Sequence, residues 1–107
     1  MPRAVDVFVL LVAAVLMWPQ AGSAETIHVA IQNLVFAPAE VHAKVGDTIV
    51  WDNKDVFLHT ATARNGSFDV NIPANKPAQL ELKQAGEVAY YCRFHPNMTG
   101  RLVVGDR

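Results

Sequence analysis

Short segments in which apolar and polar residues alternate constrain the fold of this chain more than any other feature of its sequence. Side chains of a β-strand point to opposite faces in turn, so this pattern predicts strands with one buried face. The segments are residues 26–31, 41–45, 48–52, 60–63, 78–82, 88–92 and 102–104. Turn signals such as Gly46-Asp47 separate them, and only residues 64–76 leave room for a helix. The pattern predicts an all-β sandwich of about seven to eight strands.

The first 24 residues are typical of a secretory signal peptide. Arg3 supplies the positive start, residues 7–18 form an apolar run, and Gly22-Ser23-Ala24 is a small-residue cleavage site. The run is shorter than the roughly 18 apolar residues that span a bilayer. We therefore expect a signal peptide of residues 1–24 and a mature periplasmic domain of residues 25–107. An uncleaved membrane anchor is the alternative.

The charges and the single cysteine narrow the classes of function. The chain has 9 Lys and Arg against 10 Asp and Glu, a net charge of −1, and it has no basic run. No nucleic-acid partner is expected, because such binding depends on clustered positive charge. Cys92 is the only cysteine, so no disulfide can form within the chain. A free thiol in an exported protein is open to oxidation, and binding a metal as a thiolate would protect it.

The segment richest in chemistry is the motif Cys92-x2-His95-x2-Met98. It lies between two strand segments, so we expect a tight loop there. A thiolate, a neutral imidazole and a thioether are soft ligands, which suit copper better than Mg²⁺ or Ca²⁺. Met98 is also the only Met within residues 25–107. The alternative is a buried free cysteine, a core Met and a surface imidazole, each of which is common alone.

A further strong ligand must come from elsewhere, and the chain has four histidines. His28 and His42 fall on the outward-facing positions of amphipathic strands, which indicates solvated imidazoles. His59 follows the apolar run 56–58 at a junction between loop and strand, a place that belongs to the rim of a sandwich. The predicted set has three strong trigonal ligands and one weak axial ligand: His59, Cys92, His95 and Met98. That composition is typical of blue-copper electron-transfer sites.

These residues resemble the cupredoxins, the family that includes plastocyanin, pseudoazurin and amicyanin, over essentially all of residues 26–104. The resemblance rests on two stretches: Phe36-Ala37-Pro38-x6-Val45-Gly46-Asp47-Thr48-x2-Trp51-x-Asn53-x5-His59-Thr60, and Tyr91-Cys92-x2-His95-x2-Met98 followed by Gly100. The short ligand loop looks most like that of amicyanin, which also has a Pro after the second histidine, as Pro96 is here. Thr60 departs from the Asn that many members carry. The backbone N–H at this position could still bond the thiolate, but the side-chain cross-link between the ligand loops is an open question.

The resemblance implies a Greek-key β-sandwich that binds one copper ion, as Cu(I) or Cu(II), through the four predicted ligands. It implies a type 1 copper protein that carries single electrons between redox partners and is not an enzyme. We expect those partners to dock at an apolar patch around His95, formed by residues of the two ligand loops: Phe57, Leu58, Phe94 and Pro96. The alternative is that Phe57 and Phe94 pack inward over the metal. The mature domain is expected to be a monomer without stable membrane association.

Three other functions compete with the electron carrier. A module that stores or delivers copper would be favoured by a Met-rich or His-rich tract, and the sequence has none. A copper enzyme would need an additional copper site with an open position, which two surface histidines do not supply. A structural zinc domain could use the same ligands, since zinc also accepts Cys and His.

Overall fold

The computed structural model describes residues 23–106, and these residues form nine strands and no helix. The strands are β1 (Thr26–Gln32), β2 (Val35–Ala37), β3 (Glu40–Lys44), β4 (Thr48–Asn53), β5 (His59–Ala63), β6 (Asp69–Ile72), β7 (Pro77–Glu81), β8 (Gly86–Cys92) and β9 (His95–Gly105). The all-β class predicted from the alternating pattern is therefore confirmed.

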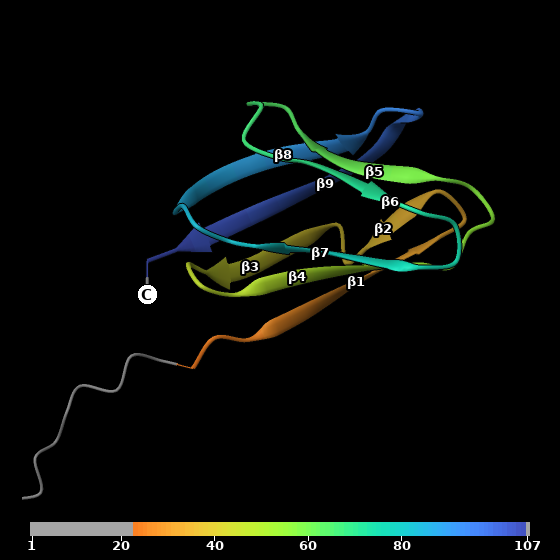
Figure 1. Cartoon of the computed structure of the whole chain (residues 1–107). Coiled ribbons are helices and arrows are strands. Elements are labelled where there is room, and N and C mark those ends of the chain that lie inside the picture. The colour runs from red at the N-terminus through yellow and green to blue at the C-terminus, as the bar shows by residue number, and fades with distance from the viewer. Residues whose placement is uncertain (1–22, 107) are drawn as a thin grey trace, which may run out of the picture.

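The strands form two sheets that pack face to face, with β1 and β4 in the lower layer and β5 and β8 in the upper layer of Figure 1. One sheet has the order β2-β1-β4-β7 and the other has the order β3-β9-β8-β5-β6. Each sheet is mixed, because β1 pairs with β4 and β3 pairs with β9 in parallel. The sandwich predicted from the sequence is thus confirmed, with crossovers between the layers.

Two strands lie in segments that the sequence predicted to be irregular. β2 is only three residues long, too short to show an alternating pattern, and it exists because a tight turn folds it back onto β1. The turn residues Asn33 and Leu34 have φ angles of 54° and 62°, which is left-handed backbone. β6 lies inside the stretch 64–76, where a helix was considered, and it pairs with β5. Both strands are stabilised by a partner strand that local sequence does not reveal.

The core between the sheets is built around the rings of Trp51 and Tyr90, whose centroids lie 5.7 Å apart with planes at 74°. The indole Nε1–H of Trp51 donates a hydrogen bond of 3.3 Å to the Tyr90 hydroxyl. Burial raises the pKa of Tyr90 to about 12, although the bond from Trp51 acts in the opposite direction. Gly100 is paired with Tyr90 across β8 and β9, and a Cβ atom at this position would collide with the Tyr90 ring. A side chain at Gly100 would therefore require the Tyr90 ring to shift.

Three of the predicted ligand residues occupy strand ends at one end of the sandwich. His59 is the first residue of β5, Cys92 is the last of β8, and His95 is the first of β9. β5 and β9 begin at the right-hand end of Figure 1, where β8 stops. The loop expected around the Cys-His-Met motif is shorter than predicted. Only Arg93 and Phe94 separate β8 from β9, and Met98 already lies within β9.

The predicted signal peptide lies almost entirely outside the described residues and stays a prediction. Of residues 1–24, only Ser23 and Ala24 are described, and both precede β1. Within residues 23–106, no helix has the length and apolar character to cross a membrane.

Candidate metal centre

Two imidazole nitrogens and one sulfur converge at the end of the sandwich. The Cys92 Sγ atom lies 3.7 Å from His59 Nδ1 and 3.8 Å from His95 Nδ1. The three ligand atoms all lie within 4.8 Å of one another. Metal–ligand bonds of 2.0–2.3 Å would put such N and S donors roughly 3.7 Å apart in a trigonal site. The spacing of these atoms therefore fits a single metal ion.

The three residues differ in their access to solvent. His59 and Cys92 are fully buried, whereas His95 is half-buried. Met98 is also buried and belongs to the same core cluster as Cys92. The arrangement thus has a dry interior side, formed by His59 and Cys92, and one imidazole at the surface.

Thr60 connects the strand of His59 to the strand of Cys92 through its backbone. Its N–H group donates a hydrogen bond of 3.4 Å to Cys92 Sγ. This contact fixes the position of the sulfur relative to the start of β5. The backbone bond considered from the sequence is present, although the residue is Thr.

The Thr60 side chain supplies the cross-link that the sequence left open. Its buried hydroxyl accepts a hydrogen bond of 2.9 Å from the backbone N–H of Arg93 and lies 2.9 Å from the hydroxyl of Thr62. Thr62 in turn donates to Asp69 across 2.7 Å, and Arg93 Nε donates to the same carboxylate oxygen across 3.2 Å. The Thr62 bond and then Arg93 hold the pKa of Asp69 below its usual range, although desolvation opposes them. The residue after Cys92 is thereby tied to β5 and β6.

Asp55 is a site residue that the sequence analysis missed. Its Oδ2 atom lies 2.9 Å from His59 Nε2, the ring nitrogen that faces away from Cys92. The same carboxylate accepts hydrogen bonds from the backbone N–H groups of Asn33, at 2.8 Å, and Leu34, at 3.1 Å. Desolvation alone would raise the pKa of Asp55, but the bonds from Leu34, His59 and Asn33 outweigh it and hold that pKa below its usual range. The one hint in the sequence was an acidic residue four positions before His59.

The two other histidines lie on the surface, as the sequence predicted. His28 Nδ1 is 2.8 Å from Asp52 Oδ2, and His42 Nε2 is 3.5 Å from Glu40 Oε2. Neither belongs to the cluster of metal-binding atoms found among the described residues.

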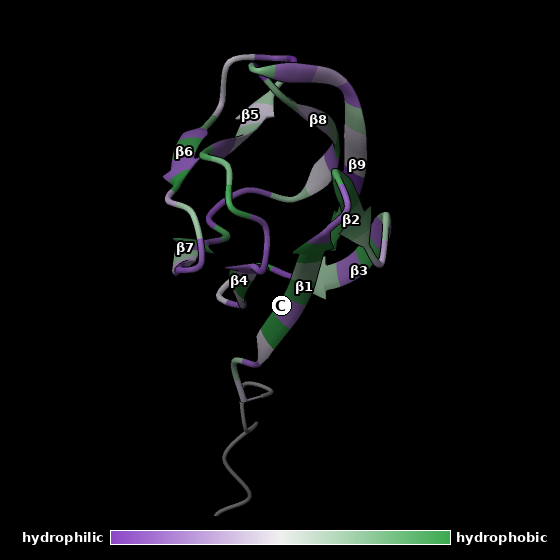
Figure 2. Ribbon diagram, turned by 90° about the vertical axis from the view of Figure 1, so that its right-hand side faces the viewer, coloured by the Kyte–Doolittle hydropathy of each residue, from purple (hydrophilic) through white to green (hydrophobic). Residues whose placement is uncertain are grey.

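Large apolar side chains are exposed in the segment directly before His59 and next to His95 in the sequence. We call them, together with the exposed Pro96, the His95 patch: Val56, Phe57, Leu58, Phe94 and Pro96. The run 56–58 that leads into β5 is coloured as hydrophobic in Figure 2. The Phe57 ring centroid lies 5.9 Å from that of His95, yet 53% of Phe57 is exposed. Phe94 is 52% exposed, so the alternative in which both rings pack inward is wrong.

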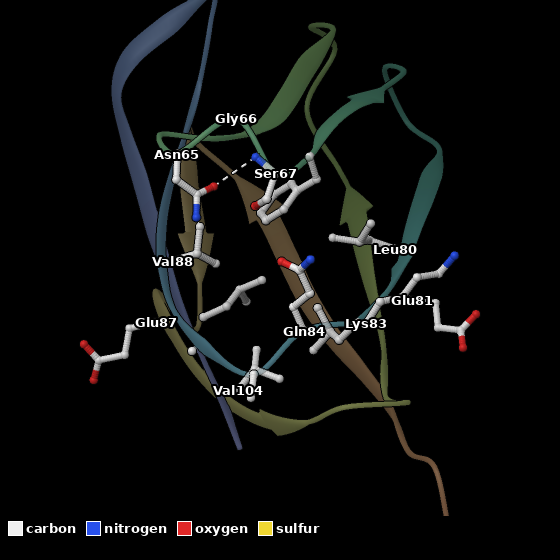
Figure 3. Close-up of a pocket in the computed structure, with 15 residues that line it drawn as sticks. Asn65, Gly66, Ser67, Leu80, Glu81, Lys83, Gln84, Glu87, Val88 and Val104 are labelled. Carbon is white, nitrogen blue, oxygen red and sulfur yellow. Dashed lines mark hydrogen bonds between the residues drawn. The ribbon is translucent and has the colours of Figure 1, made fainter. Parts of the chain in front are cut away.

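A cavity of about 590 Å³ lies away from this cluster (Figure 3). It is lined by the connections β5–β6 and β7–β8 and by parts of β7, β8 and β9, and it includes none of the four predicted ligands. His59 and Cys92 lie at the opposite ends of β5 and β8 from these connections. The metal cluster is therefore separate from the cavity.

A family model described as a cupredoxin-like domain matches residues 6–104. Amicyanin of Paracoccus denitrificans is 33% identical over 80 residues, which are 69% of this chain and 61% of that protein. Amicyanin-alpha of Methylorubrum extorquens is 31% identical and covers 78% of this chain and 73% of its own length. The match to the amicyanin of Paracoccus versutus spans 66% of that relative. The chain thus spans about two thirds or less of the first two relatives.

Solved structures of amicyanin share the fold. The crystal structure of amicyanin from Paracoccus versutus superposes with a TM-score of 0.65 at 25% identity, covering 79% of this chain and 84% of the other. A reduced Cu(I) form of an amicyanin variant at pH 4 gives a TM-score of 0.65 at 30% identity, covering 79% and 85%.

Proposed function

The chain belongs to the cupredoxin-like family, and we propose that it is an exported type 1 copper protein that carries single electrons between redox partners. The observation that carries this proposal is the cluster of His59 Nδ1, Cys92 Sγ and His95 Nδ1 within 4.8 Å. These three residues, together with the sulfur of Met98 as a weaker ligand, would hold one copper ion. The ion would supply a couple between Cu(I) and Cu(II) for one-electron transfer.

The surroundings of the cluster suit a carrier that changes its oxidation state without changing its shape. Each strong ligand sits on a strand end, and the Thr60 side chain ties β5 to Arg93 in the connection between β8 and β9. A thiolate that accepts a backbone N–H bond is held in one orientation. Ligands fixed in this way reorganise little when the charge of the site changes.

Electrons would enter and leave at His95. This imidazole is half-buried and lies within the His95 patch, whereas His59 and Cys92 are closed off from solvent. An exposed cluster of apolar side chains is typical of a surface that meets a partner. We propose that the patch docks the redox proteins that donate and accept the electron, so the protein transforms no substrate of its own.

The proposal includes the place where the protein works. The signal peptide predicted for residues 1–24 would be cleaved, and the mature domain would act in the periplasm as a monomer without stable membrane association. Export would also agree with a metal-bound thiolate. Cys92 has no second cysteine to pair with, and a metal ion would protect its thiol from oxidation outside the cytoplasm.

The test is the visible absorption spectrum of the protein after it is loaded with Cu(II). We expect an intense band from charge transfer between the Cys92 thiolate and Cu(II), together with a reversible one-electron wave in voltammetry. Replacing Cys92 with Ser should abolish the band, because a hydroxyl does not ionise near neutral pH, and His42→Ala should leave it intact. A protein that stays colourless with Cu(II) and oxidant would contradict the proposal. A coloured protein without a reversible wave would favour copper storage or delivery.

A further inference from the structure

The carboxylate of Asp55 joins the buried metal-binding histidine to a surface turn. It contacts His59 Nε2 on one side and the N–H groups of Asn33 and Leu34 on the other. We propose that Asp55 is a positioning residue that fixes the proton on Nε2 of His59 and lowers the reduction potential of the bound copper. This inference rests on the proposed function, because the potential is that of the copper carried by the same site.

Asp55 is itself held from four directions, which makes it a rigid support. Besides the two turn N–H groups, its own backbone N–H donates a bond of 2.9 Å to Asn53 Oδ1, and its carbonyl accepts one of 3.1 Å from Asn75. The Asn53 amide also donates to the Phe57 carbonyl across 2.8 Å. The side chain of Asp55 is only 11% exposed, and that of His59 is not exposed at all. A ligand oriented by such a fixed partner has little freedom to rotate.

The contact determines which nitrogen of His59 can bind a metal. An ionised carboxylate only accepts hydrogen bonds, so His59 Nε2 must be the donor. In a neutral imidazole the other nitrogen, Nδ1, then keeps its lone pair. Nδ1 is the atom that lies 3.7 Å from Cys92 Sγ. The carboxylate therefore selects the tautomer in which the free lone pair points into the metal cluster.

The charge of Asp55 should also matter for the potential. The carboxylate stands one imidazole away from the metal cluster and is shielded from solvent, where opposite charges attract more strongly than in water. A negative charge there stabilises the more positive oxidised copper over the reduced copper. The reduction potential should therefore be lower than it would be without Asp55.

A competing explanation is that Asp55 only fastens the turn between β1 and β2. Asn33 and Leu34 have left-handed backbone, and the carboxylate binds both of their N–H groups. A purely structural role would reduce the stability of Asp55 variants. It would change neither the proton position on His59 in the folded protein nor the potential of the copper.

The first experiment compares Asp55→Asn with Asp52→Asn in the copper-loaded protein. Asp52 makes the same kind of contact, 2.8 Å from His28, but its histidine is on the surface. Both variants remove one negative charge from the same region of the chain. We expect Asp55→Asn to raise the midpoint potential by an amount near a tenfold change in the redox equilibrium, about 59 mV for one electron. Asp52→Asn should raise the midpoint potential clearly less. The proposal is overturned if the potential of Asp55→Asn falls, or if it rises no more than that of Asp52→Asn.

The second experiment uses the unmodified, metal-free protein and does not depend on copper or on a variant that folds. Nitrogen-15 NMR of the histidine rings reports which ring nitrogen carries the proton. We expect the His59 proton on Nε2, with a resonance protected from exchange. A proton on Nδ1, or shared equally between the nitrogens, would overturn the proposal. Because this result is independent of the copper spectrum, failure of the positioning role and failure of the proposed function can be told apart.

Discussion

The buried hydroxyl of Thr60 accepts a hydrogen bond of 2.9 Å from the backbone N–H of Arg93. The direction of the bonds beyond this contact is set by the Asp69 carboxylate. Thr62 donates to the Asp69 carboxylate, which can only accept, so Thr62 must accept from the Thr60 hydroxyl. The order of donors therefore runs from Arg93 through Thr60 and Thr62 to Asp69, and Arg93 Nε returns to Asp69. Thr60 and Thr62 on β5 and Asp69 on β6 thus hold Arg93, the residue next to Cys92.

Removing the Thr60 hydroxyl should loosen the loop that carries Cys92 and His95. Thr60→Val keeps the shape of the side chain but leaves the Arg93 N–H without its acceptor. The bond is part-buried, and a hydrogen bond of this kind contributes about 0.5–1.5 kcal/mol, so we expect a loss of that size in the unfolding free energy of the metal-free protein. Thr60→Ser keeps the hydroxyl and is the control. A Thr60→Val variant that is as stable as Thr60→Ser would mean that the hydrogen bond to the Arg93 N–H contributes nothing beyond the packing of the methyl group.

Placing a charge in the His95 patch should slow electron exchange without changing the copper site. Val56 is 74% exposed, so Val56→Glu is not expected to disturb the core. The rate of electron exchange with a redox partner should fall several-fold, because a charge opposes desolvation of the apolar surface. The midpoint potential and the visible spectrum should stay close to those of the unmodified protein.

The control for the patch is Ala85→Glu, which adds the same charge at an exposed position in the connection from β7 to β8. It should leave the exchange rate unchanged. If both variants slow exchange equally, net charge and not docking at the patch determines the rate.

Adding a methyl group at Gly100 should destabilise the sandwich. The new Cβ would collide with the Tyr90 ring, which is fully buried and in contact with Trp51 and Phe36. Overpacking of this kind costs about 1–3 kcal/mol, and denaturant unfolding of Gly100→Ala measures it. Gly105→Ala is the matched control on the same strand, since its Cβ would lie 3.8 Å from the Ala43 carbonyl, an ordinary contact. Similar stabilities of the two variants would show that the Tyr90 ring can move aside.

Asp47 should make the stability of the fold sensitive to acid. Its carboxylate accepts hydrogen bonds of 2.9 Å from the backbone N–H groups of Glu25 and Lys44, and these bonds hold its pKa below the ordinary 3.8. A carboxyl with a lowered folded-state pKa contributes stability above its unfolded pKa and loses that contribution as the pH falls through the folded value. The stabilisation should therefore be complete above about pH 4 to 5 and disappear below that range.

The measurement is the unfolding free energy of the metal-free protein from pH 7 to pH 2, for the unmodified chain and for Asp47→Asn. The variant should be less stable at pH 7, and the difference should shrink in acid. Asp106→Asn, which alters an exposed carboxyl beyond the last strand, is the control. A difference that is constant across the whole range would exclude the Asp47 carboxylate as the source of the acid sensitivity.

The alternating pattern was sufficient to predict the fold class. The Cys-His-Met motif and the place of His59 at the start of a strand were sufficient to predict three residues that the structure brings together. Alternation is a local property of an extended backbone, so residues such as Ile49 and Trp51 reveal their buried face without knowledge of any partner strand. For the same reason, the positions of His28 and His42 in the alternating pattern predicted that both side chains face solvent. His59 stood out because it follows an apolar run at the start of a strand. The structure then shows that His59 lies close to Cys92.

Only the tertiary structure decided which side chains support these ligands. Asp55 contacts His59 because a turn at Asn33 and Leu34, more than twenty residues earlier, folds back onto it. Thr60 acts as a cross-link because β5 and β8 are neighbours and bring it to Arg93. The short strands β2 and β6 likewise depend on their partners. Strand pairing and hydrogen bonds across the sandwich join residues that are distant in the chain, and a local pattern of polarity carries no information about them.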